Sequence, residues 1–233
     1  MMRLVLFNID GTLLMTGGVG QSSAQKALER VFGTSGRLDA FYPGGRTIEA
    51  ILIETLRDAG ISMEEILAKR DQFYEDFLRE FKQQINEERF QVRPCPGAMV
   101  LIEELRKRKD ILLGLLTGNH RETAILKLQA AGFDFQHFHV GAYGDESTER
   151  PALIPIVQDR AAQRTNQTFS GHNTVVIGDT TRDVASAKAA NAYSIAVATG
   201  TDDIDQLKAA QPEYLFENLE KTQVIMTVII AKN

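Results

Sequence analysis

The stretch that decides the fold is Arg3-Leu-Val-Leu-Phe-Asn-Ile-Asp-Gly-Thr-Leu-Leu14. Leu4 to Phe7 is a short apolar run followed by polar residues and a glycine. This pattern predicts a buried strand that ends in a tight turn. In open α/β sheets, ligands bind outside the carboxyl ends of the strands. We therefore expect Asn8, Asp10 and Thr12 at the rim of a pocket.

The composition is that of a soluble globular protein, with 233 residues, 43% hydrophobic, 24% charged and a net charge of -5. An acidic chain without a Lys/Arg-rich block argues against nucleic acid or an anionic membrane as a partner. Cys95 is the single cysteine, which excludes an intramolecular disulfide and a thiolate metal cluster. With no signal segment and no apolar run long enough to span a bilayer, we expect a cytoplasmic protein.

Residues 16–92 show helical patterns and little strand signal. Thr47 to Ala59 carries apolar residues at helical spacing, and Ser62 with Glu65 has the form of a capping box before a longer helix. A glycine-rich link at 15–20 precedes a helix that Ser22 or Ser23 would cap, and Arg93-Pro-Cys-Pro-Gly97 ends the region. We predict a helical cap over residues 16–92.

From Pro96 onward, helix and strand patterns alternate. Strands are predicted at 111–116, 137–142, 174–177, 194–198 and 214–216, with helices between them. Such alternation is typical of a parallel sheet covered by helices on both faces. The predicted fold is an α/β, Rossmann-like three-layer core made of residues 1–15 and 93–233, with the helical cap inserted.

Polar motifs follow the predicted strands. They are Asn8-Ile-Asp10-Gly-Thr12, Thr117-Gly-Asn119 and Gly178-Asp179-Thr-Thr-Arg-Asp183. In order and spacing they resemble the motifs of the haloacid dehalogenase superfamily, and the resemblance covers nearly the whole chain. The cap placement and the run Ala187-Lys-Ala-Ala-Asn191-Ala also resemble the phosphoglycolate-phosphatase-like members. One position departs from the pattern, because the nucleophilic aspartate of the family is Asn8 here.

The resemblance implies a role for each acidic position. In the family, an aspartate at position 8 attacks phosphorus, and Asp10 protonates the leaving group and later activates water. Mg²⁺ prefers oxygen ligands, which the resemblance assigns to the Asn8 side chain, the Asp10 carbonyl and Asp179. Asp183 would hold a metal-bound water or orient the site.

Phosphate oxygens would bind the Thr117 hydroxyl and the backbone amides of Gly118 and Asn119, at a helix N-terminus. The family also places a cation, usually lysine, after the third strand. No lysine lies between Lys127 and Lys188, so we assign this role to Arg150, with an exposed loop arginine as the alternative.

In the cap, Arg46 precedes Thr47 at a predicted helix start. The resemblance places such a residue near the leaving group of the substrate, while an ordinary arginine at a helix start explains it equally well.

Asn8 has a direct chemical consequence. A neutral carboxamide is a poor nucleophile, although its oxygen can still bind a metal ion, so we expect intact architecture and turnover reduced by several powers of ten. Asn8 is either an engineered replacement or a feature of a natural pseudo-enzyme that binds a phosphorylated ligand or a protein partner. The otherwise full catalytic set favours replacement. Slow deamidation of Asn8 is a third explanation, which the β-branched Ile9 disfavours.

The function we predict is a Mg²⁺-dependent phosphatase of a small phosphorylated metabolite, phosphoglycolate-phosphatase-like, with Asn8 at the nucleophile position. One alternative is a β-phosphoglucomutase-like phosphomutase, which would keep all the motifs. A haloacid dehalogenase would need neither a metal nor Asp10 and Asp179. The alternative from another class is a catalytically dead phospho-ligand-binding or regulatory protein. We expect a monomer or a homodimer.

Overall fold

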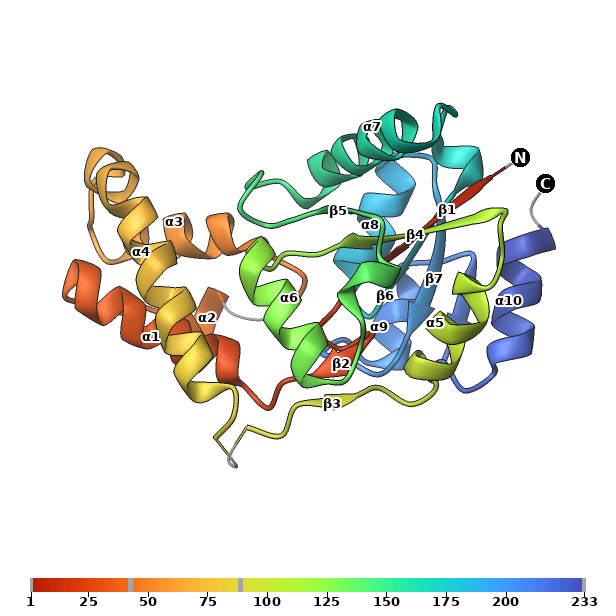
Figure 1. Cartoon of the computed structure of the whole chain (residues 1–233). Helices are drawn as coiled ribbons and strands as arrows, with labels where there is room; N and C mark the ends of the chain where they lie inside the picture. Colours follow the sequence, from red (N-terminus) through yellow and green to blue (C-terminus); the bar gives the residue numbers. More distant parts are fainter. Residues whose placement is uncertain (1, 42–43, 88–89, 232–233) are drawn as a thin grey trace.

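The computed structural model describes residues 2–41, 44–87 and 90–231. Within these residues its centre is a six-stranded sheet whose neighbouring strands are all parallel (Figure 1). Across the sheet the strands are β5 (Val140–Ala142), β4 (Ile111–Leu116), β1 (Arg3–Phe7), β6 (Thr174–Gly178), β7 (Tyr193–Val197) and β8 (Tyr214–Phe216). The chain passes from β1 to β4 on one side and later to β6 on the other, and such a reversal creates a crevice at the carboxyl ends of the strands.

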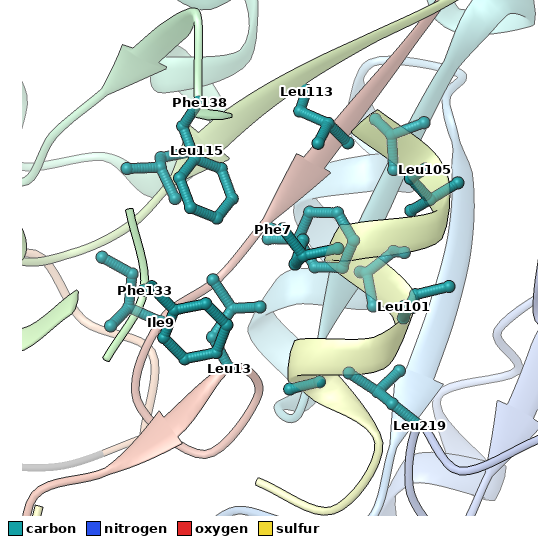
Figure 2. Packing of buried hydrophobic residues seen from close by; sticks show 14 of the residues in the cluster. Phe7, Ile9, Leu13, Leu101, Leu105, Leu113, Leu115, Phe133, Phe138 and Leu219 are labelled. Atoms are coloured by element: carbon teal, nitrogen blue, oxygen red, sulfur yellow. The ribbon is translucent and has the colours of Figure 1, made fainter. Parts of the chain in front are cut away.

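Strand β1 is buried on both of its faces. Val5 and Phe7 belong to one hydrophobic cluster, and Leu4 and Leu6 belong to another. Figure 2 shows Phe7 among Leu101 and Leu105 and other side chains of the first cluster. Burial on both faces explains why this strand is a continuous apolar run and lacks polar alternation.

Helices cover the two faces of the sheet. The helices of this part of the chain are α5 (Ala98–Arg106), α6 (Arg121–Ala130), α7 (Leu153–Thr165), α8 (Thr181–Ala189), α9 (Ile204–Ala209) and α10 (Thr222–Ala231). Residues of α5, α6 and α10 pack in the cluster of Phe7, and residues of α7 and α8 pack in the cluster of Leu4. The prediction of a three-layer α/β core with a parallel sheet is therefore confirmed.

A second group of helices lies beside the sheet, and we call it the cap (Figure 1). It consists of α1 (Val19–Phe32), α2 (Leu38–Phe41), α3 (Ile48–Asp58) and α4 (Met63–Gln84). Their buried residues form a hydrophobic cluster of their own, which includes Phe73 and Phe81. Two short antiparallel strands, β2 (Leu14–Met15) and β3 (Arg93–Pro94), join the cap to the sheet.

Local sequence signals set the ends of the cap helices. The hydroxyl groups of Thr47 and Ser62 accept hydrogen bonds from backbone amides in the first turns of α3 and α4, as N-cap residues do. The prediction that Ser22 or Ser23 caps the first cap helix is wrong. Helix α1 begins at Val19, and both serines lie inside it. Gly18, with φ of 93°, takes the cap position, so the glycine link is shorter than expected.

The strand expected at 137–142 is also shorter than the sequence suggested. Residues Phe135–His137 form a 3₁₀ turn, and the Asp134 side chain accepts a hydrogen bond from the Gln136 amide in this turn. The strand therefore begins only at Val140. Among the described residues, no helix combines the length and apolarity needed to cross a lipid bilayer.

Candidate active site

The carboxyl ends of β1, β4 and β6 open on a cavity of about 310 Å³. Its polar side chains come mainly from the loops after these strands and from the cap, and they are Asn8, Asp10, Thr16, Gln21, Arg46, Asn119, His120, Arg150, Asp179, Thr180 and Thr201. Its larger apolar side chains are Met15, Ile48, Ile51 and Phe77. The cavity is thus formed by the sheet on one side and by the cap on the other.

Asn8 lies at the bottom of this cavity, where it is 5% exposed. Its amide nitrogen Nδ2 donates hydrogen bonds to the Asp10 carbonyl oxygen at 3.1 Å and to Asp179 Oδ1 at 2.9 Å. Thr12 Oγ1 donates to the same Asp179 oxygen at 2.8 Å. Thr12 is fully buried and does not line the cavity, so it supports Asp179 and the expectation that it stands at the rim is wrong.

Asp179 is a buried carboxyl group, and its neighbours would compensate its negative charge only in part. Burial, and after it the negative charge of Asp183, raise the pKa of its carboxyl group to about 7, against the hydrogen bonds from Thr12 and Asn8 and the charge of Arg150, which lower it. A cation beside Asp179 would favour the ionised carboxylate, which burial otherwise disfavours.

Two glycines make room for the Asp179 carboxylate. A Cβ atom on Gly200 would lie 1.6 Å from Asp179 Oδ2, and one on Gly11 would lie 2.2 Å from the same oxygen. Gly11 also has a positive φ of 76°, which disfavours other residues. Gly200 could not be predicted as a site residue, because no sequence motif marks it.

We expect Gly200→Ala to lower the free energy of unfolding by about 1–3 kcal/mol, because Asp179 is only 2% exposed and cannot move away freely. Urea-induced unfolding measures the effect. Thr201→Ala is the control, since it removes atoms at the next position. A Gly200→Ala protein as stable as the control would show that the carboxylate has room to shift.

Asp10 is held by two side chains on its two oxygens. Lys127 Nζ lies 2.8 Å from each carboxylate oxygen, and Asn119 Nδ2 donates to Oδ2 at 2.7 Å. Lys127 Nζ also donates to Asn119 Oδ1 at 2.6 Å, which closes a ring of three side chains. The Asp10 side chain remains 41% exposed and lines the cavity.

Lys127 is a site residue that was not predicted from the sequence. It lies on α6 and is 2% exposed. The signal was present, because Ala124, Lys127, Leu128 and Ala131 follow the spacing of one buried helix face. A charged residue on such a face must find a partner or lose its charge.

Arg150, which we assigned as the cation after the third strand, lines the cavity. Its Nε and Nη2 donate to Asp183 Oδ1 at 3.1 and 2.5 Å, and Nη2 also donates to the Leu116 carbonyl oxygen at 3.2 Å. The other oxygen of Asp183 accepts hydrogen bonds from the amide and hydroxyl of Thr180. Asp183 does not line the cavity, and its position is that of a residue that orients Arg150.

Only part of the predicted phosphate-binding segment, residues 117–119, lines the cavity. Gly118 and Asn119 line the cavity, whereas Thr117 is fully buried and its hydroxyl accepts hydrogen bonds from the Asn119 amide and Asn119 Nδ2. His120, and not Asn119, caps α6, through its Nδ1 and the Glu122 amide. Arg46 lines the cavity from the cap and forms an ion pair with Glu54.

The cap contacts the core through the first residues of α3. The Ile48 amide donates to the Gly118 carbonyl oxygen at 2.8 Å, and the Glu49 amide donates to the Gly144 carbonyl oxygen at 3.2 Å. From the core, Arg150 Nη1 donates to the Gly45 carbonyl oxygen at 3.3 Å. These hydrogen bonds hold the cap over the cavity, with the free amides of a helix N-terminus directed at loop carbonyls.

Comparison with known proteins gives relatives that cover from about half to nearly all of the chain. A model of the family described as haloacid dehalogenase-like hydrolase matches residues 5–197. The chain is 24% identical over 240 residues to pyrophosphatase PpaX of Oceanobacillus iheyensis, across 97% of this chain and 96% of that protein. It is 31% identical over 122 residues to a phosphoglycolate phosphatase of Synechococcus elongatus, across 52% of this chain and 54% of that protein.

A solved structure supports the same assignment at the level of the fold. A hydrolase from Pseudomonas syringae superposes with a TM-score of 0.72 at 20% identity, covering 98% of this chain and 99% of that one. The family model spans β1 to β7 and therefore includes Asn8, Asp10, Arg150 and Asp179. The chain belongs to the haloacid dehalogenase-like hydrolases.

Proposed function

We propose that this site is that of a Mg²⁺-dependent phosphatase of a small phosphorylated metabolite, with Asn8 at the position of the nucleophile. The observation that carries the proposal is the convergence of Asn8, Asp10, Arg150 and Asp179 on one cavity. The relatives named above as a pyrophosphatase and a phosphoglycolate phosphatase support a phosphorylated substrate. Because Asn8 is a poor nucleophile, the chain as it stands would turn over slowly.

The residues around Asn8 fit a magnesium ion. The Asp10 carbonyl oxygen and Asp179 Oδ1 both face the Asn8 carboxamide, and a half-turn of that carboxamide would present its oxygen in place of Nδ2. Among the described residues, no three His, Cys, Asp or Glu side chains form a metal cluster, so the donors are one carboxylate, one carbonyl and one carboxamide. Such hard oxygen donors suit Mg²⁺, which would neutralise charge on a bound phosphate.

The other site residues would bind the phosphate and move a proton. Arg150 supplies a fixed positive charge, oriented by Asp183. The Gly118 amide lies before α6, where a helix N-terminus favours an anion, whereas the Asn119 amide donates to the Thr117 hydroxyl. Asp10 is the exposed carboxyl group that would give a proton to the oxygen of the leaving alcohol. The cap would exclude water while this happens.

A second candidate is a protein that binds a phosphorylated ligand without turning it over. One observation favours it, namely the two hydrogen bonds from Asn8 Nδ2. They satisfy the two oxygens that would otherwise face a cation. Within the haloacid dehalogenase-like hydrolases a phosphomutase would keep the same residues, and no contact among the described residues of the cavity favours it over a phosphatase.

The experiment compares the present chain with its Asn8→Asp variant. Each protein is incubated with a panel of small phosphate esters, with Mg²⁺ and with a chelator, and free phosphate is measured. Release of phosphate that requires both the new aspartate and Mg²⁺ supports the phosphatase. Binding of inorganic phosphate by calorimetry, with no hydrolysis by a folded variant that binds Mg²⁺, supports the ligand-binding protein and contradicts the phosphatase.

A further inference from the structure

We propose that Lys127 is a positioning residue of the active site, which holds the Asp10 carboxylate in the orientation in which it faces the cavity. This inference rests on the proposed function, because it assigns Asp10 the transfer of a proton to the leaving group. Lys127 comes from α6, an element that contributes no residue to the motifs that mark the family in this sequence.

The contacts of Lys127 all lead to the same carboxylate. Its Nζ contacts both oxygens of Asp10 at 2.8 Å, and through Asn119 Oδ1 it fixes the amide that donates to Asp10 Oδ2. Among the described residues, Asp10 is its one ion-pair partner. Two donors on two oxygens prevent rotation of the carboxylate, which leaves its exposed part directed into the cavity.

The burial of Lys127 indicates a role beyond packing. The side chain lies on the apolar face of α6 with Ala124 and Leu128, and its Nζ is 5.8 Å from the centre of the Phe81 ring on the cap. Removing an ammonium group from water is costly even when it is paired, and an apolar side chain of similar length would pack here at lower cost. The charge of Lys127 is therefore explained by what it does to Asp10.

The ion pair between Lys127 and Asp10 also affects the proposed transfer of a proton to the leaving group. In the Asn8→Asp variant, an oxygen of the new aspartate forms a bond to phosphorus while the bond between phosphorus and the alcohol oxygen breaks. Asp10 gives its proton to that alcohol oxygen, so the O–H bond of the acid breaks, a new O–H bond forms on the alcohol, and Asp10 is left as a carboxylate. Lys127 and Asn119 already donate to both oxygens of that carboxylate. Preorganised donors of this kind stabilise a charge that develops during the reaction.

The test uses Lys127→Met in the Asn8→Asp background. We expect kcat to fall about 10- to 100-fold with little change in KM, since Lys127 does not line the cavity. The loss should be at least several-fold larger for glycerol phosphate, whose alcohol needs a proton, than for p-nitrophenyl phosphate, whose phenolate does not. Lys107→Met is the matched control, because Lys107 is an exposed lysine paired with Glu104 on α5.

The comparison of leaving groups distinguishes a role of Lys127 in orienting Asp10 from a role in the folding of the site. A misfolded site would lose activity toward both substrates equally. Equal losses of activity in Lys127→Met would therefore overturn the proposal. Lys127→Gln, which keeps a donor without the charge, should retain more activity toward glycerol phosphate than Lys127→Met. If it loses as much as Lys127→Met, the hydrogen bonds from Nζ are not what orients Asp10.

A second measurement keeps the inference testable if the restored enzyme is inactive. In that event the proposed function fails, and the pairing is tested in the present chain by a cycle of Asp10→Ala, Lys127→Met and the double variant. Unfolding midpoints that combine non-additively would support the pairing. Additive shifts would show that Lys127 and Asp10 act independently and would overturn it.

Discussion

Replacing Asn8 by aspartate is expected to raise Mg²⁺-dependent hydrolysis of p-nitrophenyl phosphate by roughly 10³- to 10⁶-fold over the chain as it stands. The carboxylate supplies the nucleophile that the carboxamide lacks. The size of the gain follows from the other parts of the site, because Asp10, Arg150 and Asp179 already lie around the same cavity. Release of p-nitrophenol at saturating Mg²⁺ measures the effect.

The same substitution changes the charge of the site. In the present chain, two buried cations, Lys127 and Arg150, lie among the carboxylates of Asp10, Asp179 and Asp183. A fourth carboxylate at position 8 would replace the amide group that now donates to Asp179. We therefore expect the variant to bind Mg²⁺ at least about tenfold more tightly than the present chain, as calorimetry would measure.

The control for this prediction is Asn8→Ala, which removes the side chain without adding a charge. It should stay as inactive as the present chain, because it has no nucleophile. A gain in Asn8→Asp that persists in a chelator would contradict the role of the metal ion. Equal activity of the present chain and the variant would show that position 8 does not attack the substrate.

Asp10→Ala is expected to lower the free energy of unfolding by about 3 kcal/mol, whereas Lys127→Met should change it by less than about 1 kcal/mol. The two variants differ because the two side chains differ in their exposure to solvent. The Lys127 side chain is 2% exposed and the Asp10 side chain is 41% exposed. Removal of Asp10 leaves a buried ammonium group without its partner. Removal of Lys127 leaves a carboxylate that water can reach.

Urea-induced unfolding at neutral pH measures both changes. Asp71→Ala is the control, because Asp71 is 87% exposed and pairs with Arg70 at the surface, where such a pair contributes little. A Lys127→Met variant as unstable as Asp10→Ala would contradict the prediction, since it would mean that the carboxylate is not hydrated once its partner is gone.

The sheet and most of its helices could be predicted from the sequence, because the periodicity of apolar residues reports directly on burial. The continuous run from Leu4 to Phe7 marked a strand covered on both faces, and Thr47 and Ser62 marked helix starts through their hydroxyl groups. The predictions were wrong where a local turn competes with the secondary structure that the apolar pattern indicates. Apolar residues near His137 suggested a strand, but Asp134 stabilises a 3₁₀ turn there.

The residues of the candidate site were harder to predict from the sequence than the fold was, for a related reason. Positions at strand ends, such as Asn8 and Asp179, converge because parallel strands share one edge, and this can be inferred from order alone. Lys127 reaches the same place from the buried face of a helix, and helical spacing does not say what lies opposite that face. Only the packing of α6 over Asp10 shows it.

The central position of β1 has a consequence for how the chain is made. Leu4 pairs with Leu112 and with Thr174, so β1 is synthesised long before either of its neighbours. At ordinary rates of translation the delay to β6 is on the order of ten seconds. The cap, whose helices α1 and α4 pack on each other, can form during that interval. Until β4 arrives, Leu4 to Phe7 is an apolar strand without its neighbours, and exposed apolar strands of this kind make a nascent chain prone to aggregation.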